Sequence, residues 1–417
     1  MLLYENQEQK LINILKFIGS PFKKFVSTGE IEEDIGLVQS RKDFLQDIVN
    51  IIEKDENFIL PVIGDVGLGK THLYWALKHE LFNYNMVYIS LETVYKKFYY
   101  NTYAEFIENL SEKSEDRVEP LRNMTRRLCN DWDIGKKRFG FFQIPDIEKV
   151  KEQAFRNWSN QFDDKEALTD VITAITAHQC DPYKKLEAER WLIGDLLDVR
   201  DLSRLNLKHD LRERNVAFTM LKVLVENLKK ESVLFIDDFE RIISLRRPVY
   251  DTSENVEDIE EVFDPRWFGT KQTPENYSSE KILDKILNLN KIKGLGIIIT
   301  LKSMEFLAEI KKKIENKDPQ ILEILKEPLI MSNFRETDIF QFYKSNLEFF
   351  FARINYQDYF NHFSDSYFPL NENNLKFIFN EAKGNPREVL KHLIKIFNEI
   401  VTSNEKLDEI LAKYQVA

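Results

Sequence analysis

The sequence predicts an α/β fold in which a parallel sheet is covered by helices on both faces, with a long helical segment inserted between two strands. Four short apolar runs bounded by turn residues are typical of strands buried on both faces, and helical periodicity separates them. Residues 91 to about 230 show almost no strand pattern. At 417 residues, the chain is long enough for two or three domains with a substantial core.

The expected elements begin with a helical extension at residues 1–40. Apolar positions recur at helical spacing from Gln7 to Ile18, and Gly19-Ser20-Pro21 is expected to end that helix. Ser40 is expected to cap the next helix. The other expected elements are strands at Phe58–Ile63, Met86–Ser90, Val233–Ile236 and Leu295–Thr300, a helix at Thr71–Leu81, a polar acidic loop at Pro248–Ser279, and helices from Ile339 to Ala417.

The amino-acid composition limits which classes of protein this chain can belong to. Glycine is scarce, at 13 of 417 residues, which favours a mostly helical chain. The formal net charge of −11 repels nucleic acid and anionic membranes, so a DNA contact would be local or made through a partner. Two cysteines without metal-ligand spacing fit a reducing compartment. With no signal peptide and no apolar stretch of membrane-spanning length, we expect a cytoplasmic protein without a membrane partner.

A phosphate-binding motif follows the first predicted strand. Residues 64–71 read Gly-Asp-Val-Gly-Leu-Gly-Lys-Thr, which is the GxxxxGK[ST] pattern between a strand and a helix. The glycines let backbone amides point at phosphate oxygens, Lys70 would reach the β- and γ-phosphates, and the Thr71 hydroxyl would ligate Mg²⁺. The expected ATP-binding residues are Gly64, Asp65, Val66, Gly67, Leu68, Gly69, Lys70, Thr71 and His72.

The third predicted strand ends in two carboxylates, as in a Walker B motif. Asp237 is expected to hold Mg²⁺ through water, and Asp238 is expected to orient the attacking water. Glu240 is a second candidate for that base, because the aspartate side chain is one methylene shorter than the usual glutamate.

Two further residues are candidates for contact with the γ-phosphate. Thr300 ends the fourth predicted strand and could hydrogen-bond the attacking water. Gly384-Asn385-Pro386-Arg387 predicts a helix start, with Asn385 as the cap and Pro386 in the first turn. An arginine there is unfavourable for the helix dipole, and a nearby phosphate would explain its presence.

Taken together, GDVGLGKTHL, VLFIDD, the strand ending at Thr300 and GNPREVL resemble the AAA+ ATPases, and most closely the origin-recognition and replication-initiator-like branch. The resemblance implies an α/β AAA+ type P-loop NTPase with a parallel sheet, a large helical insertion and a C-terminal helical lid. It also implies that Thr300 is sensor 1 and that Arg387 is sensor 2. The expected domains are an N-terminal extension at 1–40, an ATPase domain at 41–305 with an insertion at about 101–214, and a lid at 306–417.

Two shorter stretches carry weaker likenesses. Ala188 to Asp195, read AERWLIGD, resembles the ATP-binding proteins of BREX-type phage-defence systems. The string FIDDFER is similar to the KAP-type and STAND NTPases.

The chain departs from the initiator-like pattern at the arginine finger. Between Thr300 and Met331 it has lysines but no arginine, and lysine lacks the planar fork that grips a phosphate. Arg246 or Arg247 could substitute. The lysines of that segment are Lys302, Lys311, Lys312, Lys313, Lys317 and Lys326. About 15 residues follow the lid, too few for the winged-helix DNA-binding domain of initiators.

Two functions from different classes fit these observations. The first is an ATP-hydrolysing subunit that acts with partner proteins on DNA, in loading, remodelling or antiviral defence. The second is a nucleotide-gated switch or scaffold with slow or no hydrolysis that assembles a partner. Either would work as a homo-oligomer or in a hetero-complex. Mixed basic and aromatic stretches at 95–100, 122–127 and 136–142 could contact DNA directly, or their aromatic residues could be core.

Overall fold

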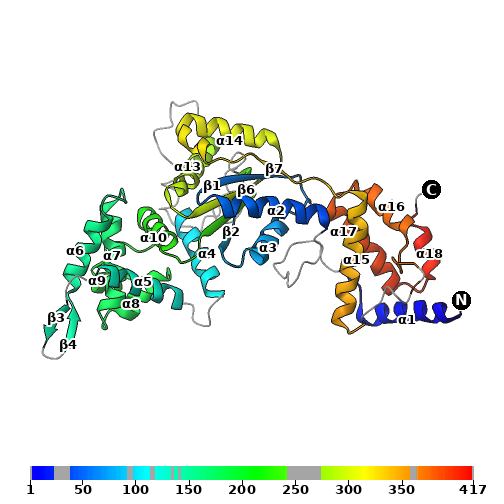
Figure 1. Ribbon diagram of the computed structural model, residues 1–417, viewed down its shortest axis with the longest axis horizontal. Coiled ribbons are helices and arrows are strands. Elements are labelled where there is room, and N and C mark those ends of the chain that lie inside the picture. Colours follow the sequence, from blue (N-terminus) through cyan, green and yellow to red (C-terminus); the bar gives the residue numbers. More distant parts are fainter. Residues whose placement is uncertain are drawn as a thin grey trace.

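The computed structural model describes residues 2–22, 38–91, 97–112, 118–132, 136–139, 142–241, 274–356, 363 and 365–415. Its centre is a five-stranded parallel sheet in the order β2-β5-β6-β1-β7 (Figure 1). The strands are β1 (Phe58–Ile63), β2 (Asn85–Ser90), β5 (Ser232–Asp237), β6 (Leu295–Leu301) and β7 (Leu329–Ile330). The expected parallel sheet is confirmed. The two-residue strand β7 was not predicted, because a partly exposed edge pair has no apolar run to mark it.

Alternating side chains divide the sheet into two buried faces. Phe58, Leu60 and Val62 pack with α2 and α3, whereas Ile59 and Ile63 pack on the opposite side. The same alternation continues in β5 and β6, so helices cover both faces as predicted. The helices around the sheet are α2 (Gln39–Lys54), α3 (Lys70–Glu80), α13 (Pro274–Asn288), η2 (Leu289–Lys291), α14 (Met304–Lys317) and η3 (Pro319–Glu323).

The insertion between β2 and β5 is built almost entirely of helices and extends to one side of the sheet (Figure 1). Its buried side chains belong to the same hydrophobic cluster as one face of the sheet. The AERWLIGD stretch lies inside this core, where Ala188, Trp191 and Leu192 are fully buried. The elements are α4 (Phe98–Glu112), α5 (Glu119–Trp132), β3 (Lys136–Phe139), β4 (Phe142–Pro145), α6 (Ile147–Trp158), α7 (Lys165–Cys180), α8 (Lys185–Leu192), α9 (Val199–Leu205) and α10 (Arg214–Glu226).

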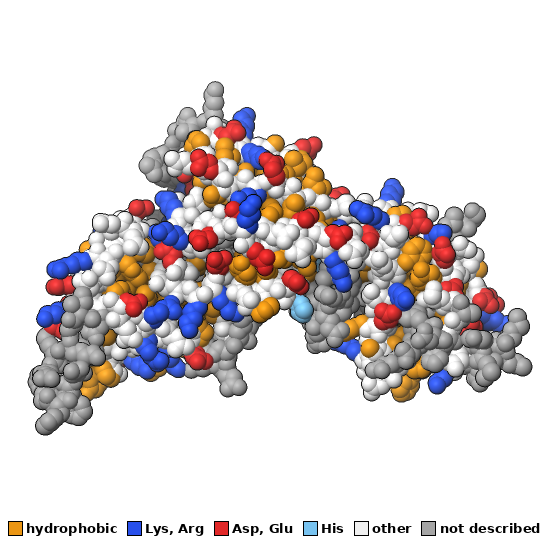
Figure 2. All heavy atoms as spheres, in the orientation of Figure 1, with side chains coloured by type: hydrophobic (Ala, Val, Ile, Leu, Met, Phe, Trp, Pro, Cys, Tyr) orange, Lys and Arg blue, Asp and Glu red, His pale blue; other side chains and the backbone are white. Residues whose placement is uncertain are grey.

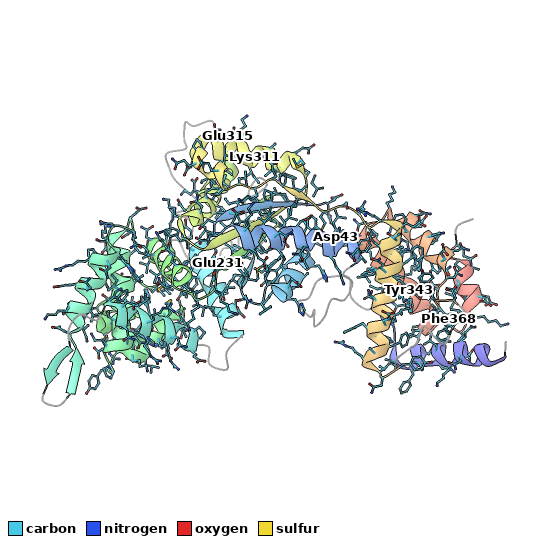
Figure 3. The ribbon with its side chains drawn as sticks, viewed as in Figure 1. Asp43, Glu231, Lys311, Glu315, Tyr343 and Phe368 are labelled. Atoms are coloured by element: carbon cyan, nitrogen blue, oxygen red, sulfur yellow. The ribbon has the colours of Figure 1, made fainter. Side chains whose placement is uncertain are left out.

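A second hydrophobic core lies at the opposite end of the molecule (Figure 1). The side chains of Tyr343 and Phe368 belong to it (Figure 3). Helix α1 (Leu2–Ile18), from the N-terminal extension, packs Leu11 and Leu15 into the same core. The other helices of this lid are α15 (Glu336–Arg353), α16 (Glu372–Ala382), α17 (Pro386–Thr402) and α18 (Leu407–Ala412).

Three expectations differ from the structure. The predicted lid began at residue 306, but α14 buries Leu307 and Ile310 in the cluster of the sheet, and the C-terminal residues of the second core begin at Ile339. Ser40 does not cap a helix: α2 begins at Gln39, and the Ser40 hydroxyl instead donates to Asp338 Oδ2 at 2.8 Å. The loop predicted over Pro248–Ser279 lies outside the described residues up to 273, and α13 begins at Pro274.

Among the described residues, no helix combines the length and the apolar character that crossing a bilayer requires.

Candidate functional site: the P-loop and the lid

The GxxxxGKT segment forms the turn between β1 and α3, as predicted. Gly67 and Gly69 have φ angles of +86° and +98°, in the left-handed region that favours glycine. Gly64 is paired to the neighbouring strand, because its amide donates to Leu301 O at 2.9 Å. The loop therefore leaves the sheet beside the end of β6 and enters α3 at Lys70. A strand, a glycine turn and a helix N-terminus in this order form an anion-binding site.

Lys70 folds back onto its own loop. Its Nζ donates to Gly64 O at 2.6 Å and to Asp65 O at 3.2 Å. Burial lowers the pKa of Lys70, while the carboxylates of Glu240, Asp237 and Asp238 act to raise it. The ammonium thus rests on neutral carbonyl acceptors, which a phosphate could replace with stronger charge-assisted bonds.

Asp237 is the centre of a hydrogen-bond network at the ends of three strands. Oδ2 accepts from the Thr71 hydroxyl at 2.6 Å and from Tyr88 OH at 3.0 Å. Oδ1 accepts from the Thr300 hydroxyl at 2.5 Å and from the Asp238 amide at 3.1 Å. These four donors fix a carboxylate that is only 3% exposed. Hydroxyl and carboxylate oxygens are the ligands that Mg²⁺ takes, so Thr71 and Asp237 fit the predicted metal role.

The metal would be shared with the nucleotide. The described residues contain no group of three or more His, Cys, Asp or Glu side chains that could hold a metal ion by themselves. Mg²⁺ in proteins commonly keeps substrate phosphates among its ligands.

Thr300 lies near the end of β6, beside Asp237 and Asp238. Its hydroxyl already makes hydrogen bonds to these two residues. It is fully buried, donates to Asp237 Oδ1, and accepts from the Asp238 amide at 3.1 Å. In this structure it positions the two aspartates.

The two candidate bases lie in different environments. The Asp238 side chain is 35% exposed, and its Oδ2 lies 4.0 Å from Arg241 Nε. The Glu240 side chain is 5% exposed, with Oε1 3.9 Å from Lys302 Nζ. Burial raises the pKa of Glu240 and the charge of Asp238 adds to this, while a hydrogen bond from its own backbone amide and the charges of Lys70 and Lys302 oppose it.

The lid contacts the P-loop directly through the predicted GNPR segment. Asn385 caps α17 as expected, and its Nδ2 also donates to Val66 O at 2.9 Å. The backbone amide of Arg387 donates to Gly67 O at 3.2 Å. A Cβ on Gly67 would lie 2.6 Å from Asn385 Oδ1, so only glycine allows this approach. The Arg387 side chain is exposed.

Arg41 makes a second connection between the P-loop and the lid side. Its guanidinium donates to Leu68 O at 3.3 Å and to Ser332 O at 2.7 Å. Burial lowers the pKa of the adjacent His72, and the charge of Arg41 lowers it further. Arg41 and His72 therefore both lie next to the P-loop.

Several other candidates lie elsewhere. Arg246 and Arg247 are outside the described residues. Lys317 and Lys326 form ion pairs with Asp284 and Asp55, at 2.6 and 3.0 Å.

The basic and aromatic stretches are largely structural where the structure describes them. Phe98 and Tyr99 are buried, and Arg122 pairs with Glu189 at 2.8 Å. The Arg127 guanidinium bonds to the carbonyl of Asn227, whereas Arg126 is exposed.

The strand order and the contact between the lid and the P-loop together define the type of fold. The P-loop strand β1 is separated from the Walker B strand β5 by β6, and a helical lid contacts the P-loop. The chain has an α/β fold with a parallel sheet, a P-loop between a strand and a helix, and a helical lid, as the motifs predicted.

Comparisons with known proteins are distant. No family model matches the chain, and no curated protein matches it. Among solved structures, a Walker-type ATPase of Pyrococcus abyssi is 12% identical with a TM-score of 0.41, covering 92% of this chain and 72% of its own. The ORC2 protein of Aeropyrum pernix, solved as ADPNP and ADP complexes, is 11% identical with a TM-score of 0.32, covering 92% and 73%.

Tyr88, Arg41 and Lys302 lie near the site but were not predicted to belong to it, and Lys302 was named only as a lysine of the segment that lacks an arginine finger. Tyr88 offered a weak signal, since it is a polar-tipped residue near the end of an otherwise apolar strand. Arg41 and Lys302 offered none, because their contacts join segments far apart in the chain.

Proposed function

We propose that the chain binds ATP with Mg²⁺ at the P-loop and hydrolyses it, with turnover that is low or dependent on a partner. Gly64 to His72 would hold the phosphates, Thr71 and Asp237 would hold Mg²⁺, and Asp238 or Glu240 would serve the attacking water. Arg387 would contact the γ-phosphate from the lid. Bound Mg²⁺ would supply positive charge for the phosphate oxygens.

The observation that carries this proposal is the convergence of three segments on one point. Lys70 and Thr71 begin α3, Asp237 ends β5, and the start of α17 bonds to Val66 and Gly67. A ligand in the loop would therefore touch both the sheet and the lid. This arrangement suits a protein in which nucleotide state changes lid position.

We further propose that the protein works in an oligomer or hetero-complex associated with DNA, with antiviral defence as one setting. Between Lys97 and Lys230 the sequence has 24 basic and 24 acidic residues, so the net negative charge lies outside the insertion. Basic side chains gather at the lower edge of the insertion in Figure 2. The insertion therefore repels DNA less than the rest of the chain taken together.

The second candidate function is a nucleotide-gated switch or scaffold of KAP or STAND type. The absence of arginine between Thr300 and Met331 favours it, because a neighbouring subunit would receive no arginine finger from that segment.

Calorimetry with Mg-ATP and Mg-ADP, together with steady-state ATP turnover with and without duplex DNA, tests the proposal. ATP binding lost in Lys70→Ala but kept in Lys54→Ala, an exposed lysine at the end of α2, supports the site. Turnover that rises with DNA supports the first function. ATP bound without turnover in either condition supports the switch, and no nucleotide binding by the natural chain contradicts both.

A further inference from the structure

Glu240 is an unusual carboxylate for a folded interior. It is 4% exposed, and its buried Oε2 atom has no hydrogen-bond partner among the residues that the structure describes. Leaving such an oxygen unpaired costs stability, so most buried polar atoms in proteins are paired. The carboxylate lies within electrostatic reach of Lys70 in the P-loop, so it belongs to the surroundings of the phosphate site.

Lys302 approaches the other oxygen of the same carboxylate. Its Nζ lies 3.9 Å from Glu240 Oε1, which is an ion-pair distance rather than a hydrogen bond. Lys302 follows β6, whose Leu301 carbonyl accepts from the Gly64 amide at 2.9 Å. The backbone of Lys302 therefore lies beside Gly64, the first residue of the P-loop. Its charge is close enough to Lys70 to interact with it.

The backbone around Asp238 explains how Glu240 reaches this place. Asp238 has a φ angle of +53°, in the left-handed region, and its amide is held by Asp237 Oδ1 and the Thr300 hydroxyl. The next amide, of Phe239, donates to Thr300 O at 3.1 Å. The chain after β5 thus turns along the end of β6, which brings Glu240 to Lys302.

We propose that Glu240 is the base of the hydrolytic reaction and that Lys302 is its positioning residue. This inference rests on the proposed function, since it assigns roles within ATP hydrolysis. Glu240 Oε2 accepts a hydrogen bond from the attacking water, and Lys302 holds Oε1 so that the carboxylate keeps one orientation.

The chemical step balances with these groups. The water oxygen forms a bond to the terminal phosphorus as the bond from that phosphorus to the bridging oxygen breaks, and the electron pair leaves on ADP. The proton released by the water passes to Glu240 and then to the phosphate product.

Asp238 is less suited to this role in the structure. Its backbone amide makes the ordered contacts, while its partly exposed side chain faces Arg241 at 4.0 Å. Its contribution is the bend that places Glu240.

The test is single-turnover hydrolysis of Mg-ATP by the full chain, together with ATP affinity and the pH profile of the rate. We expect Glu240→Gln to bind ATP within threefold of the natural chain and to lose at least 100-fold in rate. Asp238→Asn should lose less than tenfold. Lys302→Ala should lose about tenfold in kcat with little change in KM, and Lys302→Arg should recover most of that loss. Lys312→Ala, an exposed lysine on α14, is the matched control.

The outcomes separate this inference from the proposed function. Full hydrolysis by Glu240→Gln, or a large loss in Asp238→Asn alone, overturns the base assignment while ATP hydrolysis itself stands. A Lys302→Ala variant with the natural rate and pH profile overturns the positioning role. If the natural chain binds ATP but never cleaves it, both the hydrolysis proposal and this inference are overturned.

Discussion

The side-chain amide of Asn385 donates a hydrogen bond to the carbonyl oxygen of Val66 at 2.9 Å, although 319 positions separate the two residues. The contact joins the N-cap of α17, in the lid, to the exposed part of the P-loop. We therefore expect a nucleotide that changes the shape of the loop to change this bond, which would link nucleotide binding to the position of the lid.

Lys70→Ala should weaken Mg-ATP binding by about 100-fold, equivalent to about 2.7 kcal/mol. The reason is the loss of the one ammonium in the loop that can make charge-assisted bonds to the phosphates. Calorimetry measures the affinity, and circular dichroism checks that the fold is retained. Lys54→Ala serves as the control; an affinity within a few-fold of the natural chain for Lys70→Ala would show that the loop does not bind phosphate.

Gly67→Ala should detach the lid from the loop. A Cβ there meets Asn385 Oδ1 at 2.6 Å and Arg387 Cβ at 2.9 Å, so one side must move. Gly294→Ala is a matched control, since Gly294 also has a positive φ but nothing lies within 4 Å of its added Cβ. Hydrogen exchange at the start of α17 should become at least tenfold faster in Gly67→Ala only. Equal protection from hydrogen exchange in both variants would contradict a lid that is held in place by its contacts with the loop.

Glu240→Gln should raise the melting temperature of the nucleotide-free protein at about pH 8. Burial raises the pKa of Glu240, although Lys70 and Lys302 face it and oppose the effect of burial and of Asp238. The native state therefore keeps the proton where the unfolded chain has lost it. The stability that the protonated Glu240 gives to the native state is fully present below the ordinary glutamate pKa. It is lost as the pH rises through the native pKa of Glu240.

Because glutamine cannot ionise, the difference in melting temperature should shrink as the pH falls toward about 4. Thermal unfolding at a series of pH values measures it. A constant difference, or a variant less stable than the natural chain at pH 8, would mean that the carboxylate is stabilising.

The strands of the sheet were predictable to within a residue at most ends, because apolar runs flanked by turn residues have few other interpretations. The phosphate motif and the Asn385 cap were likewise predictable, since each depends on neighbours in sequence. The hydrogen bond of Ser40 was not predictable, because its hydroxyl bonds to Asp338 in the lid rather than to its own helix. Tyr88 and Lys302 were missed for the same reason: strand pairing alone brings them to Asp237 and Glu240.

Tyr88→Phe should reduce the dependence of ATP affinity on Mg²⁺. The variant keeps the ring stacked on Phe235 but removes one of the four hydrogen bonds that fix Asp237. The expected loss is about 1 kcal/mol, or roughly fivefold in affinity measured with Mg²⁺ and little without it. Tyr183→Phe, at a side chain that is 91% exposed, provides the comparison. A loss of equal size with and without Mg²⁺ would mean that Tyr88 does not act through the metal site.

We propose that Arg387 makes the lid respond to whether ATP or ADP is bound. The backbone amide of Arg387 contacts the P-loop and its side chain is exposed, so we expect the guanidinium to bind the terminal phosphate of ATP, a group that ADP lacks. Arg387→Ala should therefore lower ATP affinity by on the order of tenfold and ADP affinity by less than twofold. Lys391→Ala, one turn further along α17, should change neither.

The most direct measurement is the ratio of ATP to ADP affinity by calorimetry in the natural chain and in Arg387→Ala, with particle size followed by light scattering. We expect the ratio to fall about tenfold in the variant, and its particle size no longer to respond to ATP. An unchanged ratio, whether both affinities fall equally or neither falls, would contradict this proposal.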